Sequence, residues 1–79
     1  MNLHRHWWNG RWGRLARHDV KIYTDSSVWR VDAIEGGPEG RIRSWEPPNE
    51  DAALDLAQDL MADSDGWREL TEAHRRTHP

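Results

Sequence analysis

Hydrophobic and polar residues alternate over residues 19–45, and the pattern changes to helical spacing after Pro47-Pro48. Alternation places successive side chains on opposite faces of a strand, and two consecutive prolines cannot donate hydrogen bonds to a neighbouring strand. Asn49 then offers a favourable helix N-cap, and the apolar residues that follow recur at intervals of three and four. The sequence therefore predicts a sheet followed by one amphipathic helix, which is an α+β fold.

The alternating region contains three expected strands with two turn signals between them. The strands cover residues 19–24, 28–34 and 41–45. The turns fall at residues 25–27, which are Asp-Ser-Ser, and at residues 36–40, which contain three glycines and a proline. Because the connections are short, we expect a three-stranded antiparallel meander.

The amphipathic helix is expected from about residue 50 to residue 62. Its apolar stripe should cover one face of the sheet, so that Trp29, Leu56 and Leu60 share a core. If Trp29, Val31 and Ile42 all face the helix, the arginines of the strands lie on the opposite face of the sheet.

The two ends of the chain are rich in tryptophan and arginine. Residues 1–17 contain Trp7, Trp8 and Trp12, and Asn9-Gly10 favours a hairpin that pairs residues 4–8 with residues 11–15; a partner-binding arm is the alternative. The C-terminal end is expected to form a short second helix or a tail. We divide the single domain into an arm or hairpin, a sheet, an acidic helix and a tail, at residues 1–17, 18–46, 49–63 and 64–79.

Composition excludes several classes of protein. The chain of 79 residues has no cysteine, so disulfide bonds and thiolate metal sites are excluded. No stretch approaches the ~20 apolar residues of a membrane span, and the N-terminus does not resemble a signal peptide. We expect a cytoplasmic protein without a membrane partner. Arginine outnumbers lysine ten to one, a bias that GC-rich codons produce.

Charge is unevenly distributed along the chain. Residues 46–66 carry seven acidic side chains and no lysine or arginine, although the net charge of the whole protein is only −3. Four aspartates recur at four-residue spacing and should form one continuous ridge on the helix, namely Asp51, Asp55, Asp59 and Asp63. We call this set the acidic ridge. It is either a solvated helix face or a binding surface for a basic partner.

A second candidate surface combines arginine with tryptophan on the sheet. It would consist of Arg30, Arg41, Arg43 and Trp45. Arginine suits contact with phosphate and an aromatic ring suits stacking on a base, so this set is the alternative, nucleic-acid-binding site. Equally, the arginine stems could cover Trp45 as part of the core.

Three expected strands are followed by an Ala-containing helix in the stretch WRVDAIEGGPEGRIRSWEPPNEDAALDLAQDLM. This order resembles the DNA-binding domain of plant ethylene-response factors and the arm-binding domains of phage integrases. This resemblance implies contact with the major groove by Arg30, Arg41, Arg43 and Trp29. The stretch WRV…GG…GR…A…GWREL also resembles small proteins of actinobacteria and their phages.

Catalysis and metal binding find little support in the sequence. The serines lie in no nucleophile motif, and the five histidines lack the spacing of a metal site. We therefore expect no enzyme, no catalytic residue, no cofactor and no metal. The leading hypothesis is a small interaction protein whose acidic ridge engages a basic partner. If the chain comes from a phage or mobile element, it could antagonise a nucleic-acid-binding protein of the host.

Overall fold

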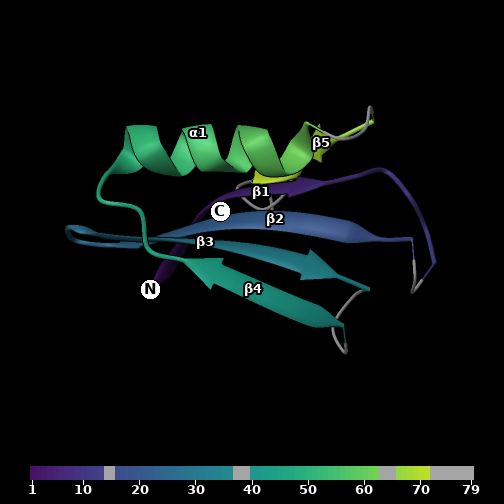
Figure 1. Cartoon of the computed structure of the whole chain (residues 1–79), viewed down its shortest axis with the longest axis horizontal. Coiled ribbons are helices and arrows are strands. Elements are labelled where there is room, and N and C mark those ends of the chain that lie inside the picture. Colours follow the sequence, from purple (N-terminus) through teal and green to yellow (C-terminus); the bar gives the residue numbers. More distant parts are fainter. Residues whose placement is uncertain (14–15, 37–39, 63–65, 72–79) are drawn as a thin grey trace, which may run out of the picture.

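The computed structural model is an α+β fold in which one helix covers one face of a five-stranded antiparallel sheet (Figure 1). It describes residues 1–13, 16–36, 40–62 and 66–71. The elements are β1 (Asn2–Trp8), β2 (His18–Asp25), β3 (Val28–Glu35), β4 (Arg41–Trp45), α1 (Glu50–Met61) and β5 (Arg68–Glu69). The strands are arranged in the order β4-β3-β2-β1-β5, so β2 is the central strand.

The sheet contains the three expected strands, but the prediction that it has only three is wrong. The N-terminal segment forms β1, which pairs with β2 from Asn2↔Thr24 to Trp8↔Asp19. Arg68 and Glu69 then pair with Trp8 and Trp7 as β5. The start of the predicted C-terminal helix or tail is therefore an edge strand, and residues 72–79 lie outside the described residues.

The predicted hairpin at Asn9-Gly10 does not form. Instead, Asn9 joins both ends of a longer connection between β1 and β2. Its backbone N–H donates to the carbonyl of His18 at 3.1 Å, and its side-chain amide donates to the carbonyl of Ala16 at 2.8 Å. These bonds hold Asn9 in a buried position, and they direct β1 to β2 rather than to residues 11–15.

Helix α1 agrees with its prediction. The Asn49 side chain accepts a hydrogen bond from the N–H of Ala52 at 2.8 Å, and Asn49 therefore caps the helix. The helix packs on β2 and β3 through Ala53 and Ala57, which are fully buried against Val20, Ile22 and Val31. Trp29, Leu56 and Leu60 pack around this cluster, so the predicted common core is confirmed.

Strand β4 presents the opposite face from the one expected. Val31 is paired with Trp45, whereas Ile34 is paired with Ile42. Since directly paired residues lie on the same face of a sheet, Trp45 shares the face of Val31 that α1 covers. Ile42 lies on the other face and is 55% exposed, so the expectation that it faces the helix is wrong.

The two faces of the sheet are named here by their relation to α1. The helix face carries Val20, Ile22, Val31 and Ala33. The helix-free face carries Asp19, Lys21, Tyr23, Arg30, Asp32, Ile34 and Ile42. No helix among the described residues covers the second face, and no described helix is long and apolar enough to span a membrane.

Candidate functional site

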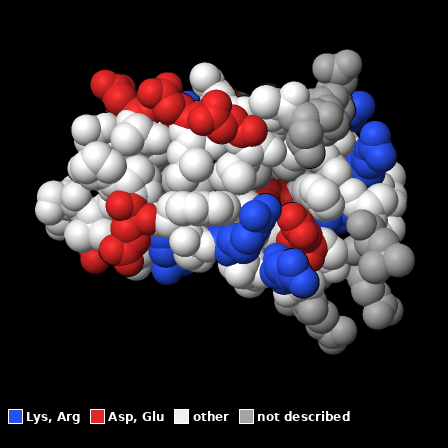
Figure 2. All heavy atoms as spheres, in the orientation of Figure 1, with Lys and Arg blue, Asp and Glu red and all other residues white. Residues whose placement is uncertain are grey.

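The acidic ridge is exposed on the side of α1 that faces away from the sheet. Asp51, Asp55 and Asp59 are all exposed, whereas Ala53 and Ala57 between them are buried. Figure 2 shows acidic side chains in a row along the helix, at the top of the view. Successive aspartates are about 6 Å apart along the axis, because four residues each rise about 1.5 Å. Asp63, the fourth expected member, lies outside the described residues.

No described cation pairs with Asp51, Asp55 or Asp59. Four arginines of the described chain instead pair with carboxylates elsewhere, as Arg5–Glu69, Arg17–Asp19, Arg30–Asp32 and Arg43–Glu35. The last turn of α1 contains no basic residue. The ridge is therefore a surface of uncompensated negative charge, available to a cation from another molecule.

The arginine and tryptophan residues of the alternative site do not form one surface. Arg41, Arg43 and Trp45 are paired with Glu35, Ala33 and Val31, and therefore lie on the helix face. Arg30 lies on the helix-free face, where its guanidinium stacks over Tyr23 at 4.7 Å and bonds Asp32 at 3.1 Å.

On the helix face Arg41 is exposed, but Arg43, Trp45 and the Trp29 of the family resemblance already make contacts within the protein. The guanidinium carbon of Arg43 lies 5.6 Å from the ring centre of Trp45, and the same guanidinium donates a hydrogen bond to Glu35. The charged group of Arg43 therefore already has partners on the sheet. Trp29 packs against the core and is contacted edge-on by His4.

A buried polar network that the sequence pattern does not reveal joins β1 to β2. The ring Nε2 of His6 lies 2.7 Å from Asp19, and Arg17 donates two hydrogen bonds to the same carboxylate. Burial alone would raise the pKa of Asp19, but the hydrogen bonds and charges of His6 and Arg17 hold it well below its usual range. In turn, the hydrogen bond to Asp19 raises the pKa of Arg17. This network needs an ionised Asp19 and so stabilises β1, which belongs to the segment expected to be a hairpin or an arm.

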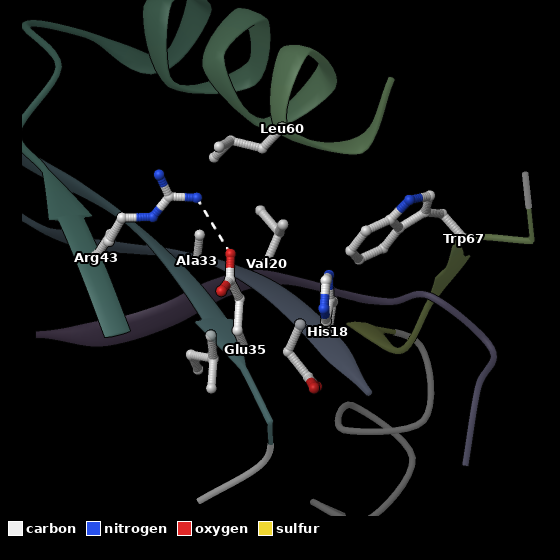
Figure 3. Close-up of a pocket in the computed structure, with 9 residues that line it drawn as sticks. His18, Val20, Ala33, Glu35, Arg43, Leu60 and Trp67 are labelled. Carbon is white, nitrogen blue, oxygen red and sulfur yellow. Dashed lines mark hydrogen bonds and ion pairs between the residues drawn. The ribbon is translucent and has the colours of Figure 1, made fainter. Parts of the chain in front are cut away.

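A small cavity lies between the C-terminal end of α1 and the helix face of the sheet (Figure 3). Val20 and Ala33 form its floor, Leu60 projects from the helix above, and Trp67 stands at one side. His18 and the Glu35–Arg43 ion pair, 3.3 Å between the charged atoms, contribute its polar groups. The indole N–H of Trp67 is buried without a hydrogen-bond partner among the described residues.

The size of this cavity argues against a substrate pocket. Its volume is about 80 Å³, whereas sites for small organic ligands usually measure ~300–1,000 Å³. A polar cavity of this size has room for a few water molecules. It contains an imidazole and a carboxylate, but no described serine or threonine lines it as a nucleophile.

Two of the three described histidines hold structural contacts, and the third, His18, lines the small cavity. His4 bonds Glu50 at 2.8 Å and so joins β1 to the first turn of α1, while His6 belongs to the Asp19 network. Within the described ranges, no three histidine or acidic side chains are grouped as a metal site would require. His74 and His78 lie outside the described residues.

The three N-terminal tryptophans have three different environments. Trp7 packs against the core on the helix face, with Arg5 stacked on its ring at 4.9 Å. Trp8 is buried near Asp19 and donates a hydrogen bond to the Arg11 carbonyl. Trp12 is 78% exposed, and among the described aromatic residues it contacts only Trp8, with an angle of 65° between the two rings.

The described surface thus offers an acidic helix on one side of the sheet and an exposed tryptophan near the other. Comparison with protein-family models, with curated protein sequences and with solved structures finds no match to this chain.

Proposed function

We propose that this protein is a small, non-enzymatic interaction protein whose acidic ridge binds a basic protein partner. The observation that carries the proposal is the exposure of Asp51, Asp55 and Asp59, while the ion pairs of the described chain involve other carboxylates. A regular row of carboxylates on a rigid helix presents charge at fixed spacing, and complementary charge chiefly accelerates and orients association.

The acidic ridge lowers the stability of the helix, and this cost supports a role in binding. Each adjacent pair of like charges at four-residue spacing costs about 0.2–0.5 kcal/mol. Aspartate inside a helix costs up to about 0.7 kcal/mol relative to alanine. Asp55 and Asp59 together with their repulsions therefore cost about 2 kcal/mol, whereas a mixture of lysine and glutamate would keep the helix soluble without this penalty.

A protein that ordinarily binds nucleic acid is the partner class that fits best. Its basic groove is built to neutralise a regular series of phosphate charges, and the ridge presents carboxylates in a regular series. An antagonist carried by a phage or mobile element would act in this way, by occupying such a groove on a host protein.

The alternative site, Arg30 with Arg41, Arg43 and Trp45, receives less support from the geometry. Its members are divided between the two faces of the sheet, and two of the arginines already bond carboxylates. We therefore do not assign nucleic-acid binding to that set.

Site-specific photo-crosslinking in the source cell tests the proposal. A crosslinking amino acid at Gln58, which is exposed beside the ridge, should capture a basic protein. The capture should be lost when Asp55 and Asp59 are both replaced by asparagine. The same amino acid at Ser27, in the exposed β2–β3 turn, is the control. Equal capture from both positions, or capture that survives the double substitution, would reject the ridge as the binding surface.

A further inference from the structure

We propose that the helix-free face of the sheet binds single-stranded nucleic acid, a role that goes beyond the protein partner of the acidic ridge. The binding track runs from Trp12 past Arg17 and Lys21 to Tyr23 and Arg30. It differs from the sequence-predicted site in using only one residue of that set, Arg30.

Exposed aromatic surface lies at one end of the track. Trp12 is 78% exposed, and its ring meets Trp8 edge-on with 4.7 Å between ring centres. The ring of Trp12 therefore remains available to an unstacked base, because only one described aromatic ring contacts it and does so at a steep angle. Arg17 lies 5.5 Å from the Trp8 ring and continues the track from the aromatic end to the sheet.

The charged groups on this face are arranged so that the cations are outermost. In the Arg17–Asp19 pair the arginine side chain is 36% exposed and the carboxylate 6%, and in the Arg30–Asp32 pair the values are 37% and 10%. An incoming ligand therefore meets guanidinium groups before carboxylates. Lys21 lies between the two pairs and has no ion pair with another described residue. Asp25, exposed at the end of β2, limits the track on that side.

A hollow of about 400 Å³ lies in the middle of the track. Arg17, Lys21 and Tyr23 line it together with the apolar Ile34 and Ile42 and with the largely buried carboxylates of Asp19 and Asp32. Its volume falls within the ~300–1,000 Å³ range of sites that enclose small organic groups. The apolar side chains suit contact with a base, and the outermost cations suit contact with its phosphate. The Arg30 guanidinium over the Tyr23 ring offers a second flat surface.

The shape of the face favours a single strand over a duplex or a lipid surface. From Arg17 to Tyr23 the chain extends over about 20 Å at ~3.3 Å per residue, enough for a few nucleotides with their bases turned toward the protein. In a duplex the bases are stacked on one another and cannot reach Trp12 in this way. Trp12 and Ile42 do expose apolar surface, but a membrane-binding face is continuously apolar, whereas the hollow in the centre of this face is lined by Arg17, Asp19, Lys21 and Asp32.

Fluorescence anisotropy with labelled dT12 and U12 oligonucleotides tests the proposal on the full chain. At low salt we expect half-saturation on the order of 1–100 μM, with affinity that falls as salt rises. Trp12→Ala should weaken binding at least about fivefold and Trp12→Phe should retain most of it, because stacking on one aromatic ring is worth about 1–3 kcal/mol per base. Lys21→Gln should reduce the slope of log affinity against log salt by about 0.7.

The matched control is Arg41→Gln, which removes one exposed positive charge from the helix face. It should leave the affinity within about twofold of wild type. Circular dichroism melting of each variant shows whether the fold is kept. No detectable binding at 20 mM salt, equal losses for Trp12→Ala and Arg41→Gln, or a 12-base-pair duplex that competes as well as dT12 would each overturn the proposal. Flotation with phosphatidylserine vesicles in the absence of oligonucleotide binding would assign the face to lipid instead.

Discussion

Replacing Ala57 by leucine should destabilise the protein, because α1 approaches the sheet most closely at its alanines. Ala57 is fully buried and belongs to the same cluster as Val20, Ile22 and Val31. If space existed, the three added carbons would contribute about 0.8 kcal/mol each by burial. The described cavity beneath the helix is lined by Leu60 and not by Ala57, so the new side chain must displace the helix or the sheet.

Overpacking of this kind costs about 1–3 kcal/mol. Since the total stability of a domain this size is on the order of 4–12 kcal/mol, the variant should lose a substantial fraction of it. A loss of 2 kcal/mol corresponds to a fall in melting temperature of roughly 8–16 °C.

The free energy of unfolding is measured by urea titration, with circular dichroism at 222 nm as the signal. Gln58→Leu is the matched control, since it adds a leucine to the next helix position, which is exposed. It should change the unfolding free energy by less than about 0.5 kcal/mol. If Ala57→Leu and Gln58→Leu unfold at the same urea concentration, the helix does not pack on the sheet through Ala57.

Three further substitutions test the core, the buried network and the helix cap. Leu60→Ala should lower the free energy of unfolding by about 2 kcal/mol, the low end of the usual range, because Leu60 is only partly buried and already borders a cavity. An unchanged urea midpoint would contradict the place of Leu60 in the core. The pKa of Asp19 is lower in the folded chain than in the unfolded chain. Its contribution to the free energy of unfolding is therefore complete above about pH 5, and it declines by up to about 1.4 kcal/mol per pH unit as the pH falls. In a His6→Asn background, which removes the neighbouring imidazole, Asp19→Asn should flatten the loss of stability between pH 4 and 2.5. Equal slopes with and without Asp19 would contradict the network. Asn49→Ala should lower the free energy of unfolding by about 0.5–2 kcal/mol, because it removes the helix cap. The control, Asn2→Ala at the exposed start of β1, should lower it by less than about 0.5 kcal/mol. Similar losses for the two variants would argue against the cap.

Local sequence patterns predict the elements that depend on neighbouring residues. Alternation locates β2, β3 and β4, and the prolines followed by Asn49 locate the start of α1. These signals suffice because each strand lies next to its sequence neighbour in the sheet, and because the cap is a contact between residues three positions apart.

The pairing of β1 and β5 could not be predicted in this way. Strand β1 is held by contacts with residues far along the chain, such as the Arg5–Glu69 ion pair at 2.6 Å and the His6–Asp19 hydrogen bond. Neither leaves a periodic signal, and the local turn preference of Asn9-Gly10 points to a different partner. Strand β5 has only two residues, too few to show any alternation.

The orientation of β4 was also undetermined by its pattern. In Arg-Ile-Arg-Ser-Trp, the two apolar residues, Ile42 and Trp45, lie an odd number of positions apart and must face opposite sides of the sheet. Hydrophobicity alone gives no reason to bury one and not the other. Pairing of Trp45 with the buried Val31 decides the orientation, and it divides the arginines of the predicted nucleic-acid site between two faces.

The acidic ridge, in contrast, could be recognised from spacing alone. Asp51, Asp55 and Asp59 share one exposed side of α1 because the helix forms where the apolar stripe predicts it. Whether cations elsewhere in the chain would neutralise the ridge depended on the tertiary structure. None of the described ones does so.

The most direct test of the ridge compares folding and binding in one variant, Asp55→Asn/Asp59→Asn. Removing the two charges relieves two adjacent repulsions, so the free energy of unfolding should rise by about 0.4–1 kcal/mol. The association rate with the basic protein captured at Gln58, measured by stopped flow at low and physiological salt, should fall and lose salt dependence. The control variant, Asp25→Asn/Glu46→Gln, removes two exposed charges away from the ridge and should associate like wild type. Unchanged association of the ridge variant at both salt concentrations would contradict the assignment of this surface to partner binding.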